Sequence, residues 1–402
     1  MAEDAHIPPV ARASAQGSGS TPQASKLERW LARRLGDEDP KRFGSGWASG
    51  TISVFLGLCG LGAVAVLHFP GWLASAELRA QYPVGAMRAL IAGVIGVGFL
   101  LGCVSLLLRR RKILGATGVL LAAMAMLAGG SAVEIDGKLD TPVYLGLDWF
   151  LLNLFVFALV FVPLERMFPR QASQRVLRAG WATDSVYFAV SHLGIQLLTF
   201  LSLLPASLVA GELTNAGLRT AVQAQPIALQ VLEIMLLGDL AQYWIHRGFH
   251  RIRWLWPFHA VHHSSRELDW LAGSRLHLVD VIVTRAFVLV PIFMLGFAQS
   301  ALVVWLVIIG LHATLNHVNL RFRMRWIEQL IVTPRFHHWH HAVTPPDRNF
   351  AVHFPWIDRL FGTFHLPRGE WPARMGLPGD PVPEGFAVQL AYPLRRRPGR
   401  IG

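Results

Sequence analysis

The sequence contains long apolar runs with almost no charge, and these runs limit the possible folds more than any other feature. Of its 402 residues, 53% are hydrophobic and only 15% are charged. About twenty apolar residues cross the hydrocarbon core of a bilayer as a helix. Six transmembrane helices are therefore predicted, at 51–69, 89–108, 113–133, 147–164, 185–210 and 227–245. The sequence predicts an all-α membrane protein.

A seventh apolar stretch, 279–311, is interrupted by Arg285 and Pro291. It is too long for one helical crossing and short for two complete ones. We expect a membrane hairpin or two tilted helices. Either arrangement returns the chain to the side on which it entered, which keeps the segments before and after the stretch together.

Basic residues indicate the orientation, because cytoplasmic loops of membrane proteins are rich in Lys and Arg. The run 109–112 reads RRRK between the second and third predicted spans, and a second basic stretch, 166–178, follows the fourth span. The alternate loops, 70–86 and 134–146, are poor in basic residues. This pattern predicts a cytoplasmic N-terminus and, after six crossings, a cytoplasmic site. The Ala/Gly/Arg-rich composition favours a bacterial inner membrane.

Charge and cysteine content exclude several classes of function. The net charge of +12 is concentrated in loops that set topology and near the C-terminus, so no nucleic-acid partner is expected. Cys59 and Cys103 both fall inside predicted spans, which leaves no disulfide framework and no iron–sulfur centre. The first 25 residues are rich in Ala, Ser, Pro, Gly and Gln and are expected to be disordered.

Histidine is concentrated in the second half of the chain. Twelve of the 17 histidines lie between His246 and His341, in the clusters HRGFH, HAVHH and HHWHH. Spacings of three and four residues place side chains on one face of a helix, so each cluster can direct two or three imidazoles to one place. Three such clusters within a hundred residues predict metal binding.

The number of imidazoles indicates two metal ions, because one ion takes only three or four protein ligands. Neutral imidazole suits iron, zinc and copper. His338, out of phase with its neighbours, is expected to be a second-shell or surface group, and His312 stays undecided. Asp239 lies seven residues before the first cluster, on the same helix face, and is expected to orient a ligand. The candidate ligands from the clusters are His246, His250, His259, His262, His263, His337, His340 and His341, with His317 and, less clearly, His277 between them.

These motifs resemble the fatty acid hydroxylase / sterol desaturase superfamily of integral-membrane di-iron oxygenases. The resemblance covers about residues 180 to 366 through YWIHRGFHRIRWLWPFHAVHHSS, LAGSRLH, HVNLRF, TPRFHHWHH, DRNFA and WIDRLFGTF. It implies a helical membrane fold with a cytosolic cap that holds two metals. The eight cluster histidines match the family's ligands and His317 its lone histidine. His277 stands in an element that lacks the family's proline, and Asn349 matches an asparagine expected in the second shell.

The resemblance divides the chain into four predicted parts. These are a disordered, basic N-terminal segment (1–46), additional N-terminal transmembrane helices (47–165), a fatty acid hydroxylase-like catalytic domain (180–366) and a C-terminal tail (367–402). The residues of the four additional N-terminal spans do not indicate a role for them.

The expected function is O2-dependent hydroxylation of a membrane lipid, such as a sterol, hopanoid, sphingolipid or fatty acyl chain, at two Fe²⁺ ions. Desaturation at the same site is an alternative, since both reactions can start with the same hydrogen abstraction. A zinc-dependent membrane hydrolase and a metal transporter are weaker alternatives. The chain has no nucleotide-binding glycine loop and no cysteine cluster, so electrons are expected from a separate transfer protein or reductase.

Overall fold

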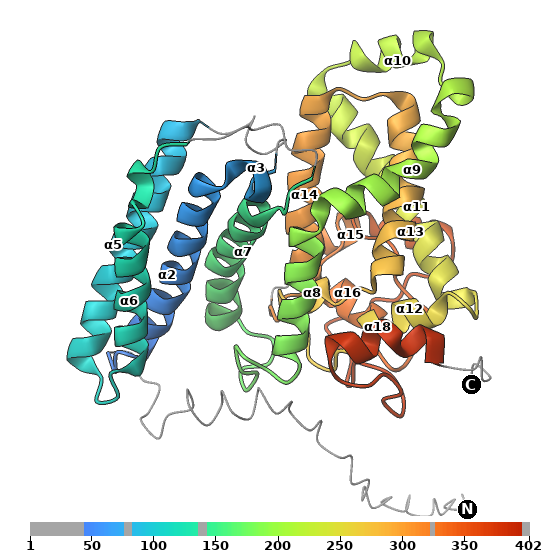
Figure 1. Ribbon diagram of the computed structural model, residues 1–402. Coiled ribbons are helices and arrows are strands. Elements are labelled where there is room, and N and C mark those ends of the chain that lie inside the picture. The colour runs from blue at the N-terminus through green and yellow to red at the C-terminus, as the bar shows by residue number, and fades with distance from the viewer. Residues whose placement is uncertain (1–43, 76–82, 136–142, 322–325, 396–402) are drawn as a thin grey trace, which may run out of the picture.

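The computed structural model describes residues 44–75, 83–135, 143–321 and 326–395 (Figure 1). Over these residues the chain is helical, without a strand but with two isolated β-bridges. Figure 1 shows an N-terminal group of helices beside a larger C-terminal unit. The predicted all-α membrane class is confirmed. The segment expected to be disordered, the first 25 residues, lies outside the described residues.

The N-terminal group consists of α2 (Trp47–His68), α3 (Pro70–Leu73), α5 (Val84–Leu108), α6 (Ile113–Leu127) and the short η1 (Gly130–Ala132). Small residues allow α2, α5 and α6 to approach closely. A Cβ added at Gly118 would lie 2.7 Å from the Cβ of Ser53. The Ser53 hydroxyl donates to the carbonyl of Gly98 at 2.6 Å. These three helices therefore pack mainly on one another.

The next helix, α7 (Leu147–Met167), packs on the C-terminal unit. Its Phe157 and Phe161 share a buried cluster with Phe188 of α8 (Trp181–Leu193). Leu271 and Val318, which lie far along the chain, belong to the same cluster.

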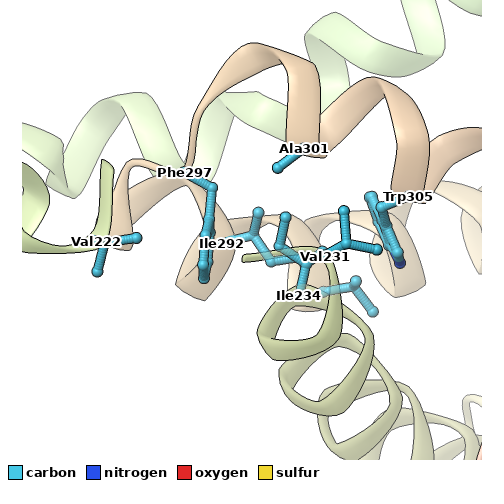
Figure 2. Packing of buried hydrophobic residues seen from close by; sticks show 8 residues of the cluster. Val222, Val231, Ile234, Ile292, Phe297, Ala301 and Trp305 are labelled. Atoms are coloured by element: carbon cyan, nitrogen blue, oxygen red, sulfur yellow. The ribbon is translucent and has the colours of Figure 1, made fainter. Parts of the chain in front are cut away.

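The C-terminal unit is built around α11 (Ile227–Arg251). Ile234 of α11 packs against Ile292 of α13 (Leu278–Leu295) and Trp305 of α14 (Gln299–His317), as Figure 2 shows. A tight turn joins α13 to α14 at Gly296, whose φ of 67° is unfavourable for most other residues. In Figure 1, α10 (Ala216–Gln223) lies at the top of this unit, and α9 (Ile195–Leu213) packs on α13. The predicted hairpin thus consists of two helices, α13 and α14, and α11 packs against both.

Short helices carry most of the histidines and complete the unit. They are α12 (Trp256–His263), η2 (Ala272–Ser274), α15 (Ile327–Leu330), α16 (Pro334–His340), α17 (Pro355–Leu360) and α18 (Phe386–Arg395). Residues 367–395, expected to be a tail, pack on this region. Tyr392 of α18 is buried with Ala260 and Val261 of α12.

Among the described residues, six helices are long and apolar enough to cross a membrane, judged by length and composition: α2, α5, α6 extended through η1, α7, α13 and α14. Four of the six predicted spans are among them, together with the two helices of the predicted hairpin, and the other two predicted spans differ. The predicted span 185–210 is broken between α8 and α9 by a bend of 66° at Gly194, so it counts as one span only if the bent pair is taken together. The predicted span 227–245 forms most of α11, which does not qualify because Gln230, Glu233 and Asp239 interrupt its apolar residues. Both α13 and α14 qualify, so the stretch expected to be short for two crossings is long enough for them.

Candidate metal centre

The structure gathers nine of the ten predicted ligands into two buried groups. In each group, the potential ligand atoms lie within 4.8 Å of one another. The five-histidine group consists of His246, His250, His259, His263 and His340, and the four-histidine group of His262, His317, His337 and His341. The geometry therefore suits two metal ions, and the binding of metal by these residues stays a prediction.

Helical spacing explains how each group is assembled. His246 and His250 are one turn apart on α11, and His259 and His263 are one turn apart on α12, so each pair points the same way. His262 is adjacent to His263 in the sequence but belongs to the other group, because consecutive side chains on a helix point in different directions.

The two groups adjoin each other. The rings of His263 and His341, one from each group, stack with their centroids 4.4 Å apart. His262 and His341, both of the four-histidine group, have centroids 4.7 Å apart.

In the five-histidine group, four of the Nδ1 atoms face outward and meet acceptors. His259 Nδ1 lies 2.7 Å from the carboxylate of Asp280. His250 Nδ1 lies 3.0 Å from the carboxylate of Asp347. His246 Nδ1 is 2.9 Å from the carbonyl oxygen of Phe350, and His340 Nδ1 is 2.8 Å from that of Arg348. Each of these Nδ1 atoms donates, so Nε2 of the neutral ring carries a lone pair.

In the four-histidine group, no carboxylate accepts a hydrogen bond from a described histidine ring. His262 Nδ1 donates to the carbonyl oxygen of Arg275 at 3.2 Å, and His317 Nδ1 donates to that of Ala313 at 2.8 Å. The Nδ1 atoms of His337 and His341 are buried without a hydrogen-bond partner.

The inward Nε2 atoms are arranged as a cation would require. The Nε2 atoms of His246 and His259 are 3.0 Å apart, and those of His262 and His317 are 3.2 Å apart. In both pairs the Nδ1 atoms donate elsewhere, so two lone pairs face each other and repel unless a cation lies between them. A bond from a metal to an imidazole nitrogen is about 2.0–2.1 Å long, which places neighbouring ligand nitrogens about 3 Å apart. The donor set fits bound metal.

Burial favours the neutral form of five of these imidazoles. It lowers the pKa of His262, His263 and His341 well below the ordinary value of histidine. The same desolvation lowers the pKa of His337 and His340. Neutral imidazole is the form that binds metal, because protonation would occupy the lone pair.

Asp239 and Asn349 were predicted to orient ligands. Both make hydrogen bonds to backbone groups and not to histidine rings. Asp239 accepts the backbone N–H groups of Val352, His353 and Phe354 at 2.7 to 3.0 Å. Asn349 has a φ of 59° and donates from its side chain to the carbonyl oxygen of Phe336 at 2.9 Å. Both therefore fix the segment whose carbonyls receive His246 and His340.

The carboxylates next to the rings are Asp280 and Asp347. Asp280 lies in the first turn of α13 and Asp347 in an irregular loop with φ of 57°, so only the tertiary fold brings them to α11 and α12.

His277 and His312 lie outside both groups. His277 Nδ1 accepts the backbone N–H of Val279 at 3.1 Å, which caps α13, and its Nε2 lies 3.1 Å from the carbonyl oxygen of Leu390. His312 Nδ1 lies 2.7 Å from Nδ1 of His353.

His338 is 1% exposed and packs on Trp371, so it is not a surface group. Trp256, the first residue of α12, lies beside His250, with ring centroids 5.0 Å apart.

Comparison with known proteins agrees with these motifs. Residues 231–363 match the fatty acid hydroxylase family. An ornithine lipid hydroxylase OlsE of Rhizobium tropici is 31% identical over 175 residues, which are 43% of this chain and 52% of that protein.

More distant relatives include an alkylglycerol monooxygenase of Danio rerio, 28% identical over 31% of this chain and 28% of the relative. A Delta(7)-sterol 5(6)-desaturase of Gibberella zeae is 24% identical over 43% of this chain and 50% of the relative. The match spans about half the length of these relatives or less. No solved structure matches the chain significantly. These matches support a fatty acid hydroxylase domain of the fatty acid hydroxylase / sterol desaturase superfamily in the matched part of the chain.

Proposed function

We propose that this chain is an O2-dependent di-iron oxygenase that hydroxylates a C–H bond of a membrane lipid. The observation that carries the proposal is the pair of adjoining buried groups made of nine imidazoles. Neutral imidazole suits iron, and the number of rings matches two ions better than one. Relatives named as hydroxylase, monooxygenase and desaturase support lipid oxidation.

Two iron ions, when bound, would supply the activation of O2, which no amino-acid side chain can perform. The protein's own contribution is position and exclusion of water. The outward Nδ1 bonds of His246, His259 and His317 fix the direction of their inward nitrogens. The burial of all nine rings keeps bulk water from the centre.

The placement of the site supports a lipid substrate. His317 is the last residue of α14, one of the six helices long and apolar enough to cross a bilayer. The candidate metal centre therefore begins where an apolar helix ends, within reach of a lipid. We propose a multi-pass protein of the bacterial inner membrane with this end facing the cytoplasm, where a separate electron-transfer protein or reductase would serve it.

Desaturation by the same centre is the second candidate, favoured by the sterol desaturase among the relatives. A zinc hydrolase fits less well, because hydrolytic two-metal sites usually include bridging carboxylates. Both candidate groups here consist of histidine alone among the described residues.

Isotope labelling tests the proposal. Membranes containing the full-length protein would be incubated with a reducing system under ¹⁸O2, and their lipids compared by mass spectrometry with those from membranes carrying His337→Ala. We expect a lipid that gains one labelled oxygen with the wild type alone. A lipid that loses two hydrogens without label would identify a desaturase. Products that form without O2, with oxygen from water, would overturn the oxygenase proposal in favour of a hydrolase.

A further inference from the structure

The C-terminal end of α7 holds two loops of the catalytic unit together, although α7 lies outside the matched residues 231–363. One carboxylate oxygen of Glu165 accepts two backbone N–H groups, that of Trp270 at 2.9 Å and that of Asn319 at 3.0 Å. These two residues are far apart in the sequence, so Glu165 ties together segments that no local structure joins.

The chain that follows α7 continues this attachment. Pro169 and Leu320 form an antiparallel β-bridge, and Arg321 donates its N–H to the carbonyl oxygen of Phe168 at 2.8 Å. The Asn319 side chain is bonded in both directions to the backbone of Gln171, at 3.0 and 3.1 Å. The segment after α14 is therefore fixed by hydrogen bonds along both its backbone and its side chain.

Both loops lead to the four-histidine group. Asn319 is two residues beyond His317, at the point where α14 ends. Trp270 precedes the η2 turn, in which Gly273 lies against the His317 ring, so close that an added Cβ would be 3.0 Å from Nδ1. The turn ends at Arg275, whose carbonyl oxygen receives His262 Nδ1.

A buried ion-pair network holds the same loop from the other side. Arg178 lies 2.9 Å from Asp269 and 2.5 Å from Asp184, and Arg275 is paired with Asp184. Asp269 in turn accepts the backbone N–H of Ala272 at 2.9 Å.

The five-histidine group is supported differently. The partners of its outward nitrogens come from Asp280 and from the segment 347–350. None of these four contacts involves residues 165–171. A change at the end of α7 should thus disturb one group and spare the other.

We propose that Glu165 is a positioning residue that aims His317 and His262, and so controls metal retention in the four-histidine group alone. The assignment rests on the proposed function only in that these groups bind metal. It places the end of α7, expected from the sequence to be additional to the catalytic domain, inside the catalytic unit.

The test compares Glu165→Ala with Glu165→Gln in the full-length protein purified in mild detergent. Iron per chain and its removal by a chelator would be measured, with thermal unfolding of the metal-free proteins as the check on folding. We expect Glu165→Ala to weaken one metal about 10- to 100-fold and leave the other unchanged, as for loss of a group supporting a ligand. Glu165→Gln should retain both, because its amide oxygen can accept the same two N–H groups.

The matched control is Asp148→Ala, since Asp148 lies at the other end of α7 and accepts the backbone N–H of Ser75 at 2.9 Å. It should keep both metals. If Glu165→Ala does not fold, Asn319→Ala tests the same link and should weaken the same metal.

Four results would overturn the assignment. The first is that Glu165→Ala retains metal as the wild type does. The second is that it loses both metals equally. The third is that Glu165→Gln is as defective as Glu165→Ala. Failure of both Glu165→Ala and Asn319→Ala to fold would show a structural role instead. A wild-type protein without metal would contradict the proposed function itself, which separates the two failures.

Discussion

The two histidine groups differ in what holds the outward side of their rings. In the five-histidine group two of the outward nitrogens meet carboxylates, Asp280 and Asp347. In the four-histidine group, the described partners are backbone carbonyls, and two outward nitrogens have no partner. A carboxylate raises the basicity of the imidazole that donates to it and adds negative charge near a bound cation. The five-histidine group should therefore hold its metal more tightly, and the four-histidine group should depend on the loops around it.

Removal of one ligand from each group should have the largest effect. His259→Ala and His341→Ala should each lose the metal of their own group and lower lipid oxidation by more than about 100-fold, because a lost ligand costs more than a lost supporting residue. Measurement of the iron content and of the amount of oxidised lipid for each variant would check this. Retention of one metal in each variant would establish two separate groups, whereas loss of both metals from either variant would mean a single cooperative centre.

Asp280→Ala tests the carboxylate support of the five-histidine group. The carboxylate is buried and lies 2.7 Å from His259, so its loss should weaken one metal about 10- to 100-fold. Chelator titration would measure this. Asp347→Ala is the matched comparison and should have a smaller effect, because Asp347 is 33% exposed and water can take its place beside His250. An equal effect of the two variants would contradict the importance of burial.

Gly273→Ala tests the dependence of the four-histidine group on its loops. The added methyl would lie 3.0 Å from His317 Nδ1, so the ring must shift by a few tenths of an ångström. Weaker binding of the metal in this group is expected, with the five-histidine group unaffected, and spectroscopy of the iron centre would report it. A metal content and spectrum identical to the wild type would show that the loop does not position His317.

His277→Ala should give the smallest effect on metal. Its ring caps α13 and contacts the backbone of α18, outside both groups. Loss of these contacts should lower stability by about 1 kcal/mol and leave the iron content unchanged. Thermal unfolding and metal analysis of the same sample would check both. Loss of a metal would instead return His277 to the set of ligands.

The sequence indicated the gathered histidines well, because three- and four-residue spacings fix which side chains share a helix face. It could not divide them into two groups. His262 and His263 are neighbours in the sequence, but His263 contacts His250 of α11 whereas His262 contacts His317 at the end of α14. Only the tertiary packing around α12 determines this division. The choice among the carboxylates also depends on tertiary structure, since Asp239 has the more suggestive spacing but Asp280 meets the ring.

The sequence predicted the membrane spans less reliably than it predicted the gathering of the histidines. Runs of apolar residues identify α2, α5, α6 and α7, which have few polar interruptions. The run at 227–245 lies in α11, which packs against α13 and α14 and buries Val231 and Ile234 there. The bend at Gly194 could not be predicted either, because residues 185–210 are uncharged and read as one continuous apolar span.

Iron content tests the central claim most directly. Protein purified anaerobically in mild detergent should contain about two irons per chain, one for each histidine group. The double variant His262→Ala/His263→Ala removes one residue from each group and should lose both ions. A wild-type protein that binds no metal even after reconstitution with Fe²⁺, or a double variant that keeps both ions, would contradict the account.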